Sequence, residues 1–583
     1  MLTTLLGVAL LSFGLPVLAQ SDELAVTAAN SGLGSNDLVT IIGTVIKVFL
    51  GVLGIIFLIL VLYSGFLWMT AGGDDKQVER AKKILINGVV GLVIMMFSYA
   101  ITSFVINALL DATGANDGNN QNGSVTIPMF SGSLGKAVRD HYPLRDQTYV
   151  ARNTNITVTF RDQIELKSLI AGYDNGGTPL DVADDVPSTA LNAENVKIFG
   201  VVDGEEVAVT DVEVYFTDDL KTFVFNPINY LGTTTGPVGY TVRLENGIRN
   251  VSEQPVFVGV DGGGYEWSFE TGVNLDLDPP TVLSVTPVAN GTYAKNIIVQ
   301  VTFDEPVDPI SASGIRDPRR GFSNLQVTGT SGVPTEGQYI ISNGYKTVTF
   351  ESSASCGINS CGEQIFCLPG GQAVTATVKA ATVGTSPPQA LGFPYDGVVD
   401  MAANSLDADG NGTAGDSHVW NFTTTNEIYL LGSSLQSISP DITAENVALD
   451  QNITLEFSDI LMSSTVNSDN ITLTNQEVVS ETSHEQWFRF NTASLTADGL
   501  EVENNTMIPA KTLVTMPHGV LLESTDGKTY VYGVNVSQGV RNQYQNCYLP
   551  AQGPNASGGM CGVTAANPYC CNGVAQATEC TLF

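Results

Sequence analysis

Two long uncharged stretches near the start of the chain predict a membrane hairpin. Val48–Met69 is a run of 22 residues without a charge, and Ile84–Leu110 is a run of 27. At about 1.5 Å per residue the first forms roughly 33 Å of helix, which matches the hydrocarbon core of a bilayer. The second is long enough to span the bilayer with tilt. Two buried core helices would be shorter and would carry charges, so we expect two transmembrane helices.

Beyond residue 128 the pattern changes to short strands in which apolar and polar residues alternate. The period of two indicates strands with one buried face. Three of these strands, ITVTF, IVQVTF and ITLEF, form a repeat. Each of the three ends in a phenylalanine that follows a proline by 17, 16 or 17 residues: Pro143 to Phe160, Pro287 to Phe303 and Pro440 to Phe457. Two repeats also close alike, with WSFET at 267–271 and WNFTT at 420–424. Repeats of this length are domain-sized, and we expect three tandem antiparallel β-sandwiches.

These patterns predict a two-helix transmembrane hairpin followed by an all-β region. The segments are a signal peptide (1–19), the hairpin (36–112), a Gly/Asn-rich linker (113–128), three β-sandwiches (129–276, 277–428 and 429–545) and a cysteine-rich tail (546–583). The signal peptide rests on an apolar core followed by Pro16 and a small residue at Ala19. The alternative is a first helix that stays uncleaved in the membrane.

A short basic loop between the two apolar runs sets the predicted topology. Its basic residues are Lys76, Arg80, Lys82 and Lys83. Loops rich in lysine and arginine stay on the cytoplasmic side. We therefore expect a multi-pass protein of the cell membrane, with residues 20–47 and the large C-terminal region outside the cell.

Small residues recur along both predicted helices. They include Gly51, Gly54, Gly88 and Gly91. Small residues let helices approach closely within lipid. They therefore predict packing either within one hairpin or between many copies of it.

The charge balance excludes one class of partner. The chain has 59 acidic and 25 basic residues, a formal net charge of −34. Such a surface repels phosphate backbones, so we expect no binding to nucleic acid. The hydrophobic share of 43% argues against a disordered chain.

The hairpin resembles a bacterial family. The segment YSGFLWMTAGGDDKQVERAKKILINGVVGLVIMMFSYAITSFVINAL is similar to the core of pilins from type IV secretion and conjugation systems. The resemblance covers residues 36–112 and implies hairpins that pack helically into a filament, with self-association or secretion-system subunits as partners. Such pilins are usually little more than the hairpin, whereas this chain continues for some 470 residues.

The β region resembles a second family. SVTPVANGTYAKNIIVQVTFDEPVDP and WNFTT are similar to the bacterial Ig-like domain of the S-layer SbsA type. The resemblance implies stalk or spacer domains of surface proteins that carry no catalytic machinery. As a separate hypothesis, the Ig-like array binds a surface ligand.

An acidic turn in the second repeat is a candidate calcium site. LDADGNGTAGD places Asp407, Asp409 and Asn411 at alternate positions, with Asp416 beyond a glycine turn. Oxygen ligands around a tight turn suit Ca²⁺, although His418 stands where an EF-hand has glutamate. The alternative is a solvated acidic turn.

Eight cysteines fall into two groups of odd size. They are Cys356, Cys361 and Cys367 in the second repeat, and Cys547, Cys561, Cys570, Cys571 and Cys580 in the tail. Export makes disulfides the expected state, and zinc is the alternative. The odd counts predict a bond between the two groups or to another chain.

No motif points to catalysis. The chain has no GxSxG, Walker, HExxH or dinucleotide-binding signature, so we expect no enzymatic activity. Two hypotheses of function remain. One is a pilin-like component of a type IV secretion or conjugation-type pilus or envelope apparatus. The other is a static surface adhesin or stalk that uses the hairpin only as an anchor.

Overall fold

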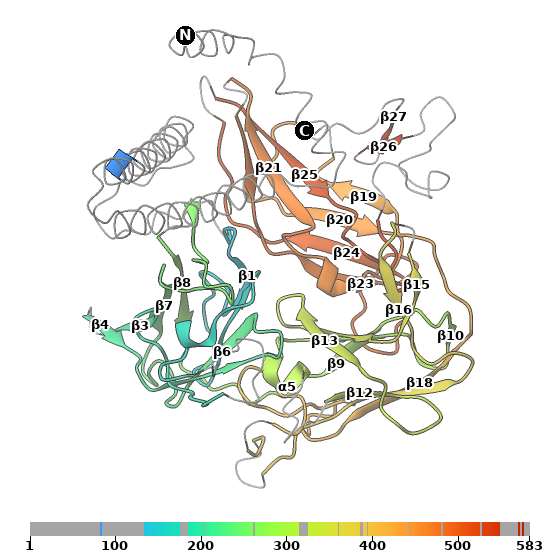
Figure 1. Ribbon diagram of the computed structural model, residues 1–583, viewed down its shortest axis with the longest axis horizontal. Helices are drawn as coiled ribbons and strands as arrows, with labels where there is room; N and C mark the ends of the chain where they lie inside the picture. The colour runs from blue at the N-terminus through green and yellow to red at the C-terminus, as the bar shows by residue number, and fades with distance from the viewer. Residues whose placement is uncertain are drawn as a thin grey trace, which may run out of the picture. The chain divides into compact units, whose positions relative to one another are not determined.

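A computed structural model describes residues 133–548, together with Lys82, Lys83 and two short strands in the tail. Within 133–548 the description omits residues 175, 177–184, 203–204, 260–262, 314–323, 360, 385–388, 393–394, 442–443, 480–481 and 525–527. The chain divides into two compact units, residues 1–116 and 117–583. The described strands all belong to the second unit and form several small, mainly antiparallel sheets (Figure 1).

Most of the predicted hairpin lies outside the described residues. This holds for both long apolar runs with their four glycines, and for Lys76 and Arg80. Lys82 and Lys83 are helical and exposed. Among the described residues, no helix has the length and apolar character needed to cross a membrane.

The first pair of sheets is built from β1 to β8. One sheet has the order β1 (Val138–Tyr142), β2 (Ile156–Phe160), β6 (Thr222–Pro227), β5 (Val212–Phe216). The other has the order β4 (Glu205–Ala208), β3 (Val196–Val202), β7 (Val238–Leu244), β8 (Tyr265–Thr271). One hydrophobic core contains residues of both sheets, including Phe160 and Trp267, which are fully buried. The two sheets are therefore the layers of one core.

The second pair of sheets repeats this arrangement. One sheet has the order β13 (Gly337–Ser342), β14 (Thr347–Ser352), β11 (Val299–Phe303), β9 (Val282–Thr286). The other has the order β10 (Thr292–Tyr293), β18 (His418–Thr424), β17 (Ala373–Val378), β12 (Leu325–Thr328). A short helix, α5 (Pro309–Ser313), and a hairpin of β15 (Ser355–Ile358) and β16 (Gln364–Phe366) complete it.

The third pair has one strand fewer among the described residues. One sheet has the order β19 (Leu435–Ser439), β20 (Ile453–Phe457), β24 (Lys511–Met516), β23 (Asn491–Leu495). The other has the order β22 (Thr482–Gln486), β21 (Ile471–Glu477), β25 (Tyr530–Val536). In the tail, β26 (Tyr569–Cys571) pairs with β27 (Val574–Gln576).

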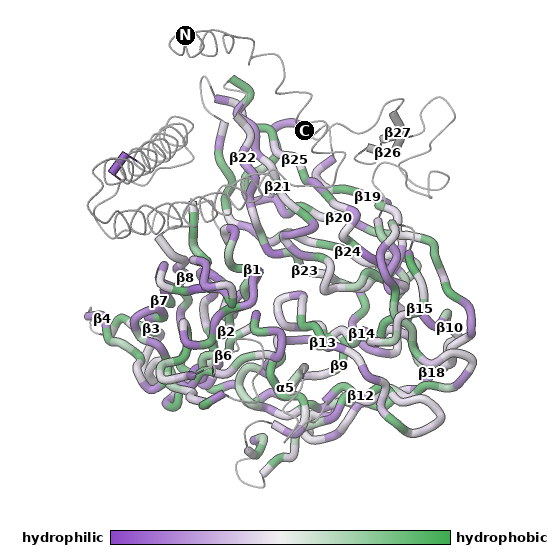
Figure 2. The backbone as a smooth tube through the Cα atoms, in the orientation of Figure 1, coloured by the Kyte–Doolittle hydropathy of each residue, from purple (hydrophilic) through white to green (hydrophobic). Residues whose placement is uncertain are grey.

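The repeated sequence motif produces a repeated local structure. The three predicted strands are confirmed as β2, β11 and β20, and their terminal Phe160, Phe303 and Phe457 pair with the first residues of β1, β9 and β19. Each of those first strands ends just before a proline with a cis peptide bond, at Pro143, Pro287 and Pro440. Figure 2 shows hydrophobic and hydrophilic residues interspersed along the strands.

The alternation fails where one sheet pair covers another. Thr157 occupies a polar position of β2 that the period-two pattern assigns to solvent, yet its side chain is fully buried. Its hydroxyl lies 3.8 Å from the sulfur of Met401 in the second pair. Contact between the pairs therefore buries a face that an isolated sandwich would expose.

Each sheet pair contacts both of the others. Between the first and second, Asn155 N–H donates to the carbonyl of Met401 at 2.8 Å. Between the second and third, Ser463 N–H donates to Oε1 of Gln300 at 2.9 Å. Between the first and third, Arg161 donates to Oγ of Ser468 at 2.7 Å. The three pairs pack together rather than meeting only at sequence neighbours.

Candidate functional site

The acidic turn lies between the loop that follows β17 and strand β18. Leu406 is fully buried, and its carbonyl accepts a hydrogen bond from Gly415 N–H at 2.8 Å. Asp407 and Asp416 form a parallel bridge. Both ends of the turn are thus held together beside the core of the second sheet pair.

Asp407 is 1% exposed, and its carboxylate is the centre of the turn's hydrogen bonds. It accepts hydrogen bonds from the N–H groups of Gly410 at 2.9 Å, Asn411 at 3.2 Å and Gly412 at 2.6 Å. Gly410 and Gly412 both have positive φ, which lets the backbone wrap around the carboxylate without a Cβ clash. Backbone N–H groups therefore offset part of its negative charge without any cation.

Three of the four residues predicted to bind calcium come together. One oxygen from each of Asp407, Asp409 and Asp416 lies within 4.8 Å of the others. Asn411 differs, because its side-chain oxygen accepts the N–H of Thr413 at 2.8 Å within the turn. Oδ2 of Asp416 accepts from Ala408 and Asp409, whereas Oδ1 is buried and has no hydrogen-bond partner. A bound cation would supply that missing partner.

Two disulfides join the four cysteines whose side chains are described. Cys356 bonds to Cys367 within the second sheet pair. Cys361 bonds to Cys547, which connects the two groups, one of the two outcomes that the odd counts predicted. Cys561 and Cys580 lie outside the described residues, and Cys570 and Cys571 are described only as part of β26. In the four bonded cysteines the sulfur is unavailable to zinc.

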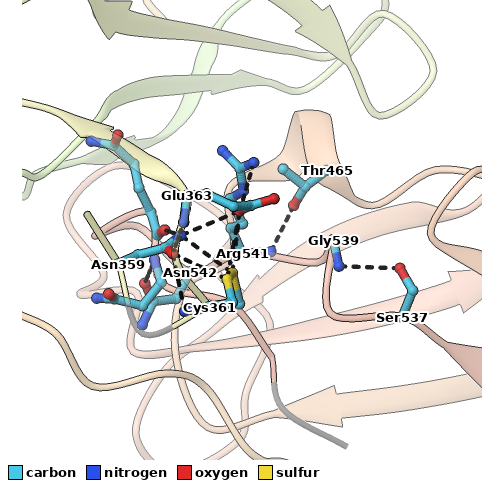
Figure 3. The surroundings of a disulfide bond; sticks show 11 residues. Asn359, Cys361, Glu363, Thr465, Ser537, Gly539, Arg541 and Asn542 are labelled. Atoms are coloured by element: carbon cyan, nitrogen blue, oxygen red, sulfur yellow. Dashed lines mark hydrogen bonds and ion pairs between the residues drawn. A yellow bond between two sulfur atoms is a disulfide. The ribbon is translucent and has the colours of Figure 1, made fainter. Parts of the chain in front are cut away.

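Charged and amide side chains surround the Cys361–Cys547 bond (Figure 3). Glu363 forms an ion pair with Arg541 at 2.9 Å. The side-chain nitrogen of Asn359 donates to the carbonyl of Gln545 at 2.9 Å. These contacts hold the β15–β16 hairpin of the second pair against the last loop of the third, so the disulfide reinforces an existing interface.

A second carboxylate cluster was not predicted from the sequence. Oxygens of Asp276, Glu305 and Asp400 lie within 4.8 Å of one another. Asp276 follows the last strand of the first pair, while Glu305 and Asp400 belong to loops of the second. Residues so far apart in the chain give no local motif, and only the packing of the two pairs brings them together.

Burial and mutual repulsion raise the pKa values of this cluster. Burial, followed by the nearby charges of Asp400 and Asp276, raises the pKa of Glu305 to about 9. Burial raises the pKa of Asp400 to about 7 against the opposing hydrogen bonds from Asn404. Burial also raises the pKa of Asp276. At neutral pH Glu305 therefore holds its proton, which relieves repulsion within the cluster.

Comparisons with known proteins gave one family match, to the N-terminal region, and several weak structural similarities. No characterised protein matches the chain by sequence. Among solved structures, surface layer protein SbsC, domains 1–6, is 14% identical, covering 83% of this chain and 63% of that one at a TM-score of 0.17. L,D-transpeptidase 3 from Mycobacterium tuberculosis is also 14% identical, covering 50% of this chain and 92% of that one at 0.14. TM-scores this low establish neither the fold nor the function of this chain.

The family comparison is confined to the N-terminal region. Residues 34–105 match the family of type IV secretion system pilins. This range contains the first predicted span, the basic loop and most of the second span. It agrees closely with residues 36–112, where the resemblance was seen in the sequence. The similarity to type IV secretion system pilins therefore covers residues 34–105 and does not extend into the β region.

Proposed function

We propose that the protein is a pilin-like component of a type IV secretion or conjugation-type apparatus, anchored in the cell membrane by its two-helix hairpin. The observation that carries this proposal is the pilin match at residues 34–105, which coincides with two uncharged runs and a basic loop. Its partners are the lipid bilayer and further pilin or secretion-system subunits.

The β region is the exported part of this proposal. Disulfides persist in oxidising compartments outside the cytoplasm, and the described β region contains two of them. Its strands carry the repeat that resembles bacterial Ig-like domains. We assign to it the presentation of a surface ligand site, without enzymatic activity or nucleic-acid binding.

Calcium binding at the acidic turn forms a separate proposal. The supporting observations are the approach of three carboxylates and the buried, unpartnered Oδ1 of Asp416. Asp407, Asp409 and Asp416 would bind the ion, which would add positive charge where six backbone N–H bonds only partly offset the carboxylates. Asn411 would have to give up its bond to Thr413 to become a fourth ligand.

Cysteine labelling on intact cells tests the topology. A membrane-impermeant thiol reagent should label Thr235→Cys, which lies at an exposed site of the first sheet pair, and should not label Gly73→Cys in the basic loop. Permeabilised cells should label both. Labelling of Gly73→Cys alone on intact cells would reverse the proposed orientation.

Crosslinking in the membrane tests whether the hairpin assembles as a pilin. A ladder of high-order species should disappear in Gly88→Leu, since a large side chain blocks close helix approach. Gly88→Ala is the matched control and should retain the ladder. A native protein that gives no ladder would favour the alternative, a static surface adhesin or stalk in which the hairpin is only an anchor.

A further inference from the structure

Strand β25 of the third sheet pair is the equivalent of β7 in the first. β25 pairs with β21 as β7 pairs with β3. The hydroxyl of Tyr532 in β25 accepts the N–H of Leu522, and the hydroxyl of Tyr240 in β7 accepts the N–H of Gly232. The loops that follow also match, since Tyr548 N–H donates to Val540 as Val256 N–H donates to Ile248.

The two strands differ in what lies on their other edge. β7 pairs with β8 there, and in the second sheet pair β17 pairs with β18. These closing strands bring Trp267 and Trp420 into the cores. β25 has β21 as its one strand neighbour among the described residues (Figure 1). Of the described residues in the third pair, none forms a closing strand.

The free edge of β25 presents backbone groups in the register that a strand requires. Val478 N–H donates to the carbonyl of Thr529, so the backbone groups of residue 529 face β21. Backbone groups alternate sides along an antiparallel strand, which turns those of Tyr532, Val534 and Val536 toward the free edge. An edge with unpaired N–H and C=O groups is a template for another strand.

The partial burial of core-facing side chains in β25 also indicates that a neighbouring strand is missing from this edge. In β7 the core-facing Val238, Tyr240, Val242 and Leu244 are all buried. Their counterparts Tyr532, Val534 and Val536 pack against the core of the third pair but stay only half-buried. A fourth strand would cover these side chains as β8 covers those of β7.

We propose that residues 560–566 of this chain's own tail add to the free edge of β25 as an antiparallel closing strand. The spacing is the first argument. β8 begins nine residues after Val256, and β18 begins twelve after the equivalent Leu406. The same intervals after Tyr548 reach residues 557–560.

The sequence of the tail is the second argument. Cys561, Val563 and Ala565 are apolar and alternate with Gly562 and Thr564, the period of a strand with one buried face. The later tail strands β26 and β27 pair with each other and leave the earlier segment to fill this role. Residues 560–566 themselves lie outside the described residues.

Hydrogen exchange of the full-length protein tests the proposal. The amides of Tyr532, Val534 and Val536 should exchange slowly in the native chain and lose that protection in Val563→Pro, which removes a bonding N–H and distorts the strand. Ala551→Pro, placed between Tyr548 and the closing segment, is the matched control and should keep the protection. Slow exchange of Val514 in β24 verifies that each variant is folded.

Three results would overturn the proposal. Rapid exchange of the three amides in the native chain would mean that the edge is open. Protection that survives Val563→Pro would assign the covering strand to another segment. Protection that falls on dilution of the native protein would assign it to a second copy or another chain.

Discussion

Removing the Cys361–Cys547 disulfide should destabilise the protein more than removing Cys356–Cys367. The two bonds close loops of very different length, with sequence separations of 186 and 11 residues. A crosslink stabilises the fold mainly by restricting the unfolded chain, and its contribution grows with the logarithm of the loop length. That relation gives about 5 kcal/mol for the longer loop and about 3 kcal/mol for the shorter.

The assay compares two double variants, Cys361→Ala/Cys547→Ala and Cys356→Ala/Cys367→Ala, by denaturant unfolding without reductant. Trp267 and Trp420 are buried in the first and second sheet pairs, and Trp487 lies in the third, so versions that keep one of the chain's four tryptophans each report on one pair. The long-loop variant should show the lower midpoint, with the largest change in the second and third pairs. An equal or larger loss in the short-loop variant would refute the loop-length argument for these bonds.

Three further predictions concern charge. Burial raises the pKa of Glu305 from 4.5 to about 9, so the folded protein holds a proton that the unfolded chain loses. The free energy of unfolding should then fall as pH rises between these values, by about 1.4 kcal/mol per pH unit for one proton. Glu305→Gln should flatten that slope in melts from pH 5 to 8. Equal slopes for the native protein and the variant would contradict the raised pKa of Glu305. Calcium at about 100-fold above Kd should add roughly 2.7 kcal/mol to the native protein but not to Asp409→Ala, and equal melting midpoints with calcium and with chelator would favour a solvated turn. Asp469→Asn removes ion pairs to Arg139 and Arg161 at a partly exposed contact. Each lost pair should lower the free energy of unfolding by at most about 1 kcal/mol. A loss of several kcal/mol would contradict this and show that the two ion pairs are essential to the contact between the first and third sheet pairs.

The sequence predicted local structure well because local rules determine it. Alternation identified β2, β11 and β20, since one face of each strand meets a core. The acidic turn was also found, because its carboxylates are a few residues apart and its glycines supply the positive φ. Asn411 was assigned to the ion on spacing alone, and the pattern could not reveal that its oxygen bonds to Thr413.

The sequence did not predict the features that depend on packing between sheet pairs. Thr157 alternates as a solvent-facing residue, yet it is buried, and its hydroxyl contacts Met401 of the second pair. Asp276, Glu305 and Asp400 carry no shared motif, and acidic residues are too common in this chain for any three to stand out. The partner of Cys361 was likewise open until the hairpin at β15–β16 was placed beside residue 547.

The contact between the first and third sheet pairs has a consequence for the order of folding. The side chain of Ser133 bonds to the carbonyl of Trp487, 354 residues later. At about 5–20 residues per second, roughly 20 to 70 s separate the synthesis of these two residues. During that interval the third pair is not yet complete and cannot cover this face of the first. Polar and cationic side chains lie on this face, and they include Ser133, Lys136 and Arg161. Such side chains are well solvated, so the face is compatible with exposure to water before the third pair covers it.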